Sequence, residues 1–290
     1  MARRSAKPSA TVNTVSALLE RLGRPSTDRV VILVCHGLGC SNAANLAIHE
    51  AMRTGIATSA GLQVPCPWAR GAAADHQGDD VGVSLTVNAE HDRYRWGPIT
   101  RAPSLLDGDG GFPRTPTDLG EHADLDELRR ELRAQVERAI LWGFDPTHLG
   151  SHLDALCYRP ELFDVYLDLA VEFRLPMSLP DPSVDLGFPA RKLADEEGVI
   201  SADHVVAGPL HHDARAAVDA ALRDLAPGVT EIRVRPGKDT PELRAISATW
   251  AANVADAHLA TTDWAMRAAV DRAGAQLVGY RELRSAQRAG

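Results

Sequence analysis

The sequence lacks the features that mark membrane, secreted and nucleic-acid-binding proteins. No apolar run approaches the roughly 20 residues of a membrane-spanning helix, so we expect no membrane partner. The basic, polar N-terminus is not followed by the apolar stretch of a secretory signal, which favours a cytoplasmic location. With a net charge of −8 and no long basic cluster, the chain is not expected to bind nucleic acid.

Cysteine is also scarce, and its spacing excludes a zinc ribbon. The four cysteines are Cys35, Cys40, Cys66 and Cys157. We expect them to be reduced thiols, as is usual in a cytoplasmic protein. Cys35 follows an apolar run and is more typical of a small buried strand-end residue than of a nucleophile.

What the sequence does contain is a regular alternation of strand-like and helix-like segments. Its 290 residues are 44% hydrophobic, enough for one large core. We predict strands at residues 30–34, 58–64, 81–87, 147–152, 175–179, 204–207, 229–234 and 276–280. We predict helices at residues 14–22, 41–54, 124–142, 213–225 and 262–273, and another that begins at Pro160.

This alternation predicts an α/β fold with a parallel sheet and helices outside it. The number of strands favours a TIM-barrel-like (β/α) barrel, complete or incomplete, formed by a single domain over residues 13–290. Residues 1–12 are expected to be a disordered tail. In such barrels the site lies at the C-terminal ends of the strands. Several polar residues fall there and are expected around one opening: His36, Ser84, His148, His152 and Arg235.

The stretch Thr147–His152 carries two histidines. Side chains alternate along a strand, so His148, Gly150 and His152 would share one face. Imidazoles aimed into one pocket suit metal binding or acid/base chemistry. The alternative is a pair of strand-end histidines with ordinary hydrogen bonds.

A long irregular segment follows the third predicted strand, over residues 88–111. Loops of this length in a compact domain are commonly functional. Its aromatic residues Tyr94 and Trp96 could form a platform for a sugar, or they could pack the loop down onto the protein. The polar cluster at residues 90–92 is expected to be solvated loop.

These landmarks resemble the YdjC/ChbG-like carbohydrate deacetylase family, including its HpnK-like branch. Residues 36–45 (His-Gly-Leu-Gly-Cys-Ser-Asn-Ala-Ala-Asn) are similar to the motif Asp-Asp-x-Gly-x-Ser-x-x-x-Asn. Residues 82–86 (Gly-Val-Ser-Leu-Thr) are similar to Gly-Val-His-Leu-Thr, and residues 147–152 (Thr-His-Leu-Gly-Ser-His) to Thr-His-x-Asp-Ser-His. Residues 235–237 (Arg-Pro-Gly) stand where the family has His-Pro-Gly.

The resemblance implies metal-dependent removal of an N-acetyl group from an amino sugar, and it suggests a homodimer. A divalent ion would polarise the acetyl carbonyl and activate water. The corresponding ligand positions hold Gly37, Ser84 and His152, of which His152 alone is retained. His36 stands at the position of the catalytic base, and Arg235 at that of the late histidine.

Three hypotheses follow. The first is a degenerate deacetylase, in which no cofactor is expected because glycine and serine replace ligands. The second is an active hydrolase with a rebuilt site, in which His36, His148 and His152 hold a divalent metal such as zinc or magnesium. The third is a protein that binds a small carbohydrate or a partner through the 88–111 segment. At Arg235 the guanidinium could bind an anionic group or pair with a carboxylate of the protein.

Overall fold

A curled parallel sheet organises the chain. The computed structural model describes residues 17–207 and 214–290, so the predicted disordered tail lies outside the described residues. The strands are β1 (Arg29–Leu38), β2 (Ser59–Leu62), β3 (Val81–Leu85), β4 (Leu149–Ser151), β5 (His204–Ala207), β6 (Gly228–Val234) and β7 (Ala275–Leu277). They form a seven-stranded sheet in the order β4-β3-β2-β1-β6-β5, with β7 beside β1.

Strand β1 lies at the centre and pairs in parallel with three others. It pairs with β6 along residues 29–35, with β7 along residues 29–31, and with β2 from residue 34 onward. The continuous apolar run at residues 30–34 is buried on both faces, as its composition predicts. Consecutive residues of this run belong to two separate apolar clusters, one on either side of the sheet.

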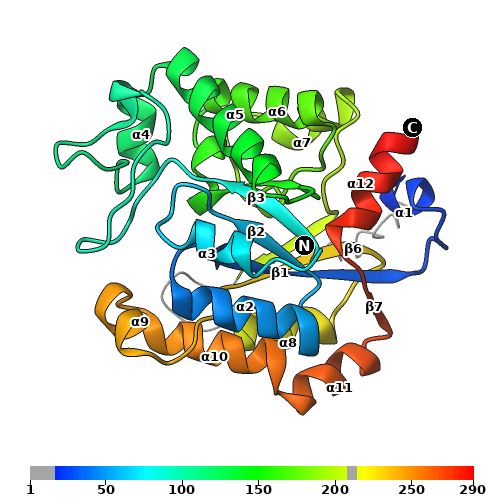
Figure 1. Ribbon diagram of the computed structural model, residues 1–290. Coiled ribbons are helices and arrows are strands. Elements are labelled where there is room, and N and C mark those ends of the chain that lie inside the picture. Colours follow the sequence, from blue (N-terminus) through cyan, green and yellow to red (C-terminus); the bar gives the residue numbers. More distant parts are fainter. Residues whose placement is uncertain (1–16, 208–213) are drawn as a thin grey trace, which may run out of the picture.

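The helices pack against the sheet, most of them on its outer face. They are α1 (Ala17–Arg21), α2 (Asn42–Thr54), α3 (Ala69–Ala74), α4 (Pro116–His122), α5 (Leu125–Leu141), α6 (Pro160–Phe173), α7 (Ala190–Glu196), α8 (Arg215–Arg223), α9 (Pro241–Ile246), α10 (Trp250–Thr261), α11 (Trp264–Arg272) and α12 (Tyr280–Ala289). Two short 3-10 helices are η1 (Pro103–Leu105) and η2 (His152–Cys157). Figure 1 shows α5 and α6 on one side of the curled sheet and α2, α8 and α10 on the other.

The barrel is incomplete between β4 and β5. The segment at residues 175–179, predicted as a strand, makes only an isolated parallel bridge between Met177 and Leu149. On its other side the Met177 N–H donates to the Ile200 carbonyl at 2.8 Å. A single irregular segment therefore spans the gap, and the predicted single-domain (β/α) barrel is confirmed in its incomplete form.

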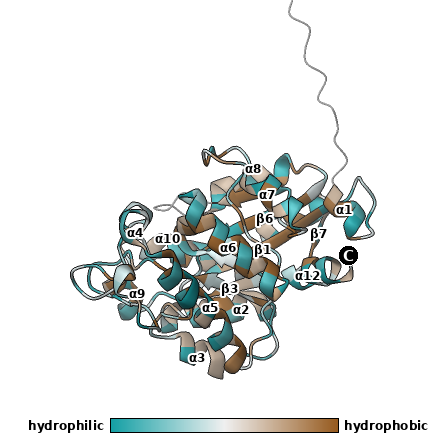
Figure 2. Cartoon of the chain, turned by 90° about the horizontal axis from the view of Figure 1, so that it is seen from above, coloured by the Kyte–Doolittle hydropathy of each residue, from teal (hydrophilic) through white to brown (hydrophobic). Residues whose placement is uncertain are grey.

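The inner face of the sheet is apolar near the strand starts and polar near the strand ends. Helices α1 and α12 close the apolar end, where their side chains pack with those of β1 and β6: Leu18, Leu19, Val30, Ile32, Val34, Val229, Tyr280 and Leu283. Figure 2 shows hydrophobic colouring along these central strands. Further along β6, Glu231 and Arg233 are buried and bonded to each other. Within the described ranges, no helix is long and apolar enough to cross a membrane.

Candidate functional site

The C-terminal ends of the strands surround a cavity of about 470 Å³, which we call the strand-end cavity. Its lining comes from the ends of β1, β2, β4 and β6 and from the loops that follow β1, β3 and α9. The lining includes His36, Gly37, Cys40, Gln63, Glu90, His91, Arg114, His152, Leu153, Asp154, Arg233, Arg235, Ser247 and Thr249. Cavities of this size accommodate small organic ligands.

The strand-end cavity brings together four of the predicted site residues, His36, Gly37, His152 and Arg235. The first two end β1, His152 follows β4, and Arg235 follows β6. The other predicted site residues, Ser84, Tyr94, Trp96 and His148, are not part of the described lining. Of the five residues predicted around one opening, His36, His152 and Arg235 line the cavity, whereas Ser84 and His148 are not part of its described lining.

His148 lies deeper in the barrel than was expected. Its ring is 1% exposed and stacks on Tyr280 with the ring centroids 4.0 Å apart. Gly82 makes room for it, because a Cβ there would come within 2.3 Å of the imidazole. Burial lowers the pKa of His148 to about 4, so the ring is neutral at pH 7. His148 was also a candidate substrate-binding residue, but its contacts are those of a packed interior side chain and it is not part of the described cavity lining.

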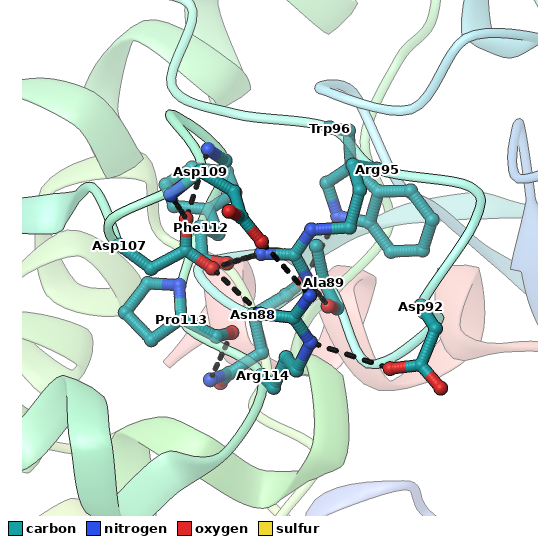
Figure 3. A network of polar contacts seen from close by, with 11 residues as sticks. Asn88, Ala89, Asp92, Arg95, Trp96, Asp107, Asp109, Phe112, Pro113 and Arg114 are labelled. Atoms are coloured by element: carbon teal, nitrogen blue, oxygen red, sulfur yellow. Dashed lines mark hydrogen bonds and ion pairs between the residues drawn. The ribbon is translucent and has the colours of Figure 1, made fainter.

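The two aromatic residues of the long loop pack inward. The Trp96 ring is 5% exposed, and its indole N–H donates to the Asn88 carbonyl at 2.8 Å. The Tyr94 hydroxyl donates to the Cys40 carbonyl at 2.8 Å. Figure 3 shows Trp96 beside Arg95, which binds Asp107 and the Ala89 carbonyl within the same loop. These contacts support the packing role rather than the sugar platform.

His152 is held on both sides of its ring. Its Nδ1 lies 2.6 Å from Gln63 Nε2, and its Nε2 lies 2.9 Å from Glu90 Oε2. Because the amide N–H donates to Nδ1, Nε2 carries the proton and donates to the carboxylate. Burial raises the pKa of Glu90, but the interactions of its carboxylate with His152 and His91 outweigh burial and hold that pKa at about 2. Glu90 was expected to be solvated loop, and the structure corrects this: the carboxylate orients His152 at the cavity wall.

The residues at the family's three ligand positions do not fit a divalent metal. Gly37 has no ligand atom, and both nitrogens of His152 are engaged by Gln63 and Glu90. Ser84 is 1% exposed with its Oγ unpartnered, and it lies outside the cavity lining. Across residues 17–207 and 214–290, no three histidine, cysteine, aspartate or glutamate side chains are grouped to hold an ion. The geometry thus gives no basis for a metal on His36, His148 and His152.

The turn after β4 is held in an unusual backbone conformation. Leu153 and Asp154 both have left-handed backbone angles, with φ of 54° and 51°. This conformation disfavours residues with a Cβ, and such strain is maintained only where the surroundings enforce it. The Asp154 carboxylate accepts from Arg233 Nη1 at 3.0 and 3.2 Å, and this ion pair ties the turn to β6. The strained turn positions His152 immediately before it.

Cys40 is a cavity residue that the sequence reasoning did not select. The neighbouring side chains Cys66 and His91 lower the pKa of Cys40 to about 6, against the effect of burial. Its position just before helix α2 was the available signal, since thiols near helix N-termini tend to be ionised. The Cys40 thiol therefore ionises more readily than an ordinary cysteine thiol.

Comparison with known proteins places the chain in one family. The sequence model for the YdjC-like protein family matches residues 30–272. A carbohydrate deacetylase of Thermus thermophilus is 38% identical over 183 residues, which cover 63% of this chain and 65% of that protein. A carbohydrate deacetylase of Geobacillus stearothermophilus is 34% identical over 171 residues, or 56% of this chain and 66% of that protein. The chain thus spans just under two thirds of either relative.

One solved structure shares the fold over nearly its whole length. It is described as a cellobiose-phosphate cleavage protein of Enterococcus faecalis, and it matches with a TM-score of 0.78 at 23% identity. The match covers 88% of this chain and 99% of the other. The solved structure shows the shared fold, and the family match over residues 30–272 shows that the chain belongs to the YdjC-like protein family.

Proposed function

We propose that this YdjC-like protein binds a carbohydrate in the strand-end cavity and lacks metal-dependent deacetylation. The related proteins named carbohydrate deacetylases support carbohydrate as the ligand class. The cavity volume of about 470 Å³ is large enough for a mono- or disaccharide. Hydroxyl groups of Ser247 and Thr249 line one wall and can bond to sugar hydroxyls.

The hydrogen bonds of His152 are the observation that supports the proposed absence of metal-dependent deacetylation. Catalytic zinc sites keep three protein ligands and an open position for water. Here both ring nitrogens of His152, the one retained ligand residue, are hydrogen-bonded to Gln63 and Glu90. Gly37 and Ser84 stand at the other two ligand positions. Gly37 has a φ of 97° and a Cβ there would meet open space, so the missing carboxylate leaves the cavity wider.

Acetate release from N-acetylglucosamine oligomers tests this proposal. We expect no release by the wild-type protein with added zinc, nickel or magnesium. The combined variant His36→Asp, Gly37→Asp and Ser84→His restores the family's ligand and base residues, and it is the positive comparison. The φ of 97° at Gly37 is strained for aspartate, so folding of this variant is checked by circular dichroism. Metal-dependent turnover by the wild type that His152→Ala abolishes would overturn the proposal.

A further inference from the structure

Two arginines on β6 and its C-terminal extension face the strand-end cavity, and their surroundings differ. Arg233 donates to Glu231 at 2.6 Å, to Asp154 at 3.0 Å and to the Leu179 carbonyl at 2.7 Å. Arg235 is bonded through its main chain, with its N–H donating to Asp256 at 2.8 Å. Its guanidinium makes no hydrogen bond or ion pair with any residue in the described part of the chain.

The carboxylates around Arg235 do not fully offset the cost of burying its positive charge. Burial lowers the pKa of Arg235 more than its neighbours, led by Asp256, raise it. At Arg233 the balance is reversed, because Glu231 and Asp154 outweigh burial and raise the pKa. Glu90 is bonded to His152 and Asp154 to Arg233, so these two carboxylates of the cavity wall already have cationic or imidazole partners.

A second polar group without a partner lies beside Arg235. Cys35 of β1 pairs with Val234 of β6, so the next residues, His36 near the end of β1 and Arg235 just after β6, lie at the same level. His36 Nε2 is buried and has no hydrogen-bond partner among the described residues. Buried polar groups without partners are uncommon in folded proteins and indicate a missing ligand or water. The guanidinium, and the imidazole in the tautomer with a protonated Nε2, thus offer adjacent donors to one anionic group.

We infer that the strand-end cavity binds an acidic saccharide, whose carboxylate or phosphate accepts hydrogen bonds from Arg235 and His36. This rests on the proposed carbohydrate binding and specifies its ligand class. Guanidinium groups match carboxylate and phosphate oxygens in pairs. The remaining wall offers apolar contacts from Leu153 and Leu243 and hydroxyls from the loop before α10. The acidic group is held at the ends of β1 and β6, and the sugar ring extends toward α9.

Calorimetric titration of the full chain tests this inference with a matched ligand set. The probes are glucose, glucuronic acid, glucose 6-phosphate, the corresponding cellobiose derivatives and inorganic phosphate. We expect at least one acidic sugar to bind about tenfold or more tightly than its neutral counterpart, as a charge-assisted hydrogen bond provides. The carboxylate and phosphate arms show which anion is preferred.

Arg235→Gln is expected to weaken binding of the acidic sugar about tenfold or more and so to remove its preference over the neutral sugar. Arg235→Lys keeps the positive charge and should retain part of the preference for the acidic sugar. The matched control is Arg114→Gln, because Arg114 lines the same cavity but is already paired with Asp107 and Asp109 (Figure 3). Unchanged melting temperatures show that the variants are folded.

The outcomes separate this inference from the proposed function. Equal binding of neutral and acidic sugars, unaffected by Arg235→Gln, would overturn the acidic ligand and leave carbohydrate binding standing. Inorganic phosphate as tight as glucose 6-phosphate would overturn the saccharide as the recognised ligand. Failure of every sugar to bind would overturn both.

Discussion

At the scale of single residues, Cys40 differs from the other thiols of the chain. Cys35 and Cys157 are buried, and burial raises the pKa of each. Cys40 is partly exposed at the cavity wall, and Cys66 and His91 stabilise its thiolate. Thiolates rather than thiols react with alkylating agents, so the environment of Cys40 selects it for modification.

We predict that iodoacetamide alkylates Cys40 selectively at pH 7, with a midpoint of the rate near the pKa of about 6. Peptide mass spectrometry after short exposures from pH 5 to pH 9 measures this. The control is Cys66→Ala, which removes the largest contribution that lowers the Cys40 pKa and should move the midpoint upward. Equal labelling of Cys40 and Cys157, or a midpoint above pH 8, would contradict the assignment.

At the scale of elements, the retained family motif shapes the turn between β1 and α2. Ser41 caps α2 and accepts from the Ala44 N–H at 3.1 Å. Asn45 accepts from the Gly39 N–H at 2.7 Å and donates to the Trp68 carbonyl at 3.1 Å. Gly39 has a φ of 90°, and a Cβ there would come within 3.0 Å of the Ala69 backbone. The three retained residues thus maintain backbone geometry, whereas the two aspartates of the family motif are replaced by His36 and Gly37.

Substitutions in this turn should therefore reduce stability. We expect Ser41→Ala to lower the free energy of unfolding by about 1 kcal/mol through loss of the cap. Asn45→Ala should cost about 1–3 kcal/mol, because the buried Gly39 N–H loses its acceptor. Urea unfolding followed by circular dichroism measures both. The control Thr54→Ala, exposed at the other end of α2, should change stability by less than about 0.5 kcal/mol, and an equal loss there would refute the turn-specific effect.

The elements also show which predictions local sequence can support. Helices α2 and α5 match closely because Ser41 and Asp124 cap them and glycine follows each. Helix α10 was not predicted, because its alanine-rich sequence shows little contrast between faces. The predicted last strand is shorter than expected, since Tyr280 begins α12 and turns inward to the barrel.

At the scale of the whole molecule, the alternation of elements predicts the barrel but not the partners across it. Strand ends locate His36, His152 and Arg235, because all parallel strands end at the same edge. Glu90 and Cys40 are brought to His152 and His91 by loop paths that no local pattern records. The stacking of His148 on Tyr280 joins residues far apart in sequence, so alternation alone could not place that ring.

The barrel interior also contains a buried polar network that couples stability to pH. Glu231 is fully buried and accepts from Arg233 and Ser178 at 2.6 Å and from Tyr280. Burial raises its pKa, but Arg233 and these hydrogen bonds outweigh burial and hold it at about 2. In the unfolded chain a glutamate has a pKa of about 4.3. Between these values the unfolded state binds a proton and the folded state does not, so lowering the pH favours unfolding.

We therefore predict that the free energy of unfolding falls as the pH is lowered from about 5 toward 2. Glu231→Gln should be less stable than wild type at pH 7 by about 3 kcal/mol, because it leaves Arg233 with one carboxylate partner in a buried site. Its stability should also fall less steeply through this window, since the titrating group is gone. Urea titrations at pH 7, 5, 4 and 3 measure both effects.

Glu196→Gln, at an exposed surface pair with Lys192, is the control and should reproduce the wild-type profile. A Glu231→Gln profile parallel to that of the wild type would exclude Glu231 as the source of acid sensitivity, because only loss of its titration can flatten the slope.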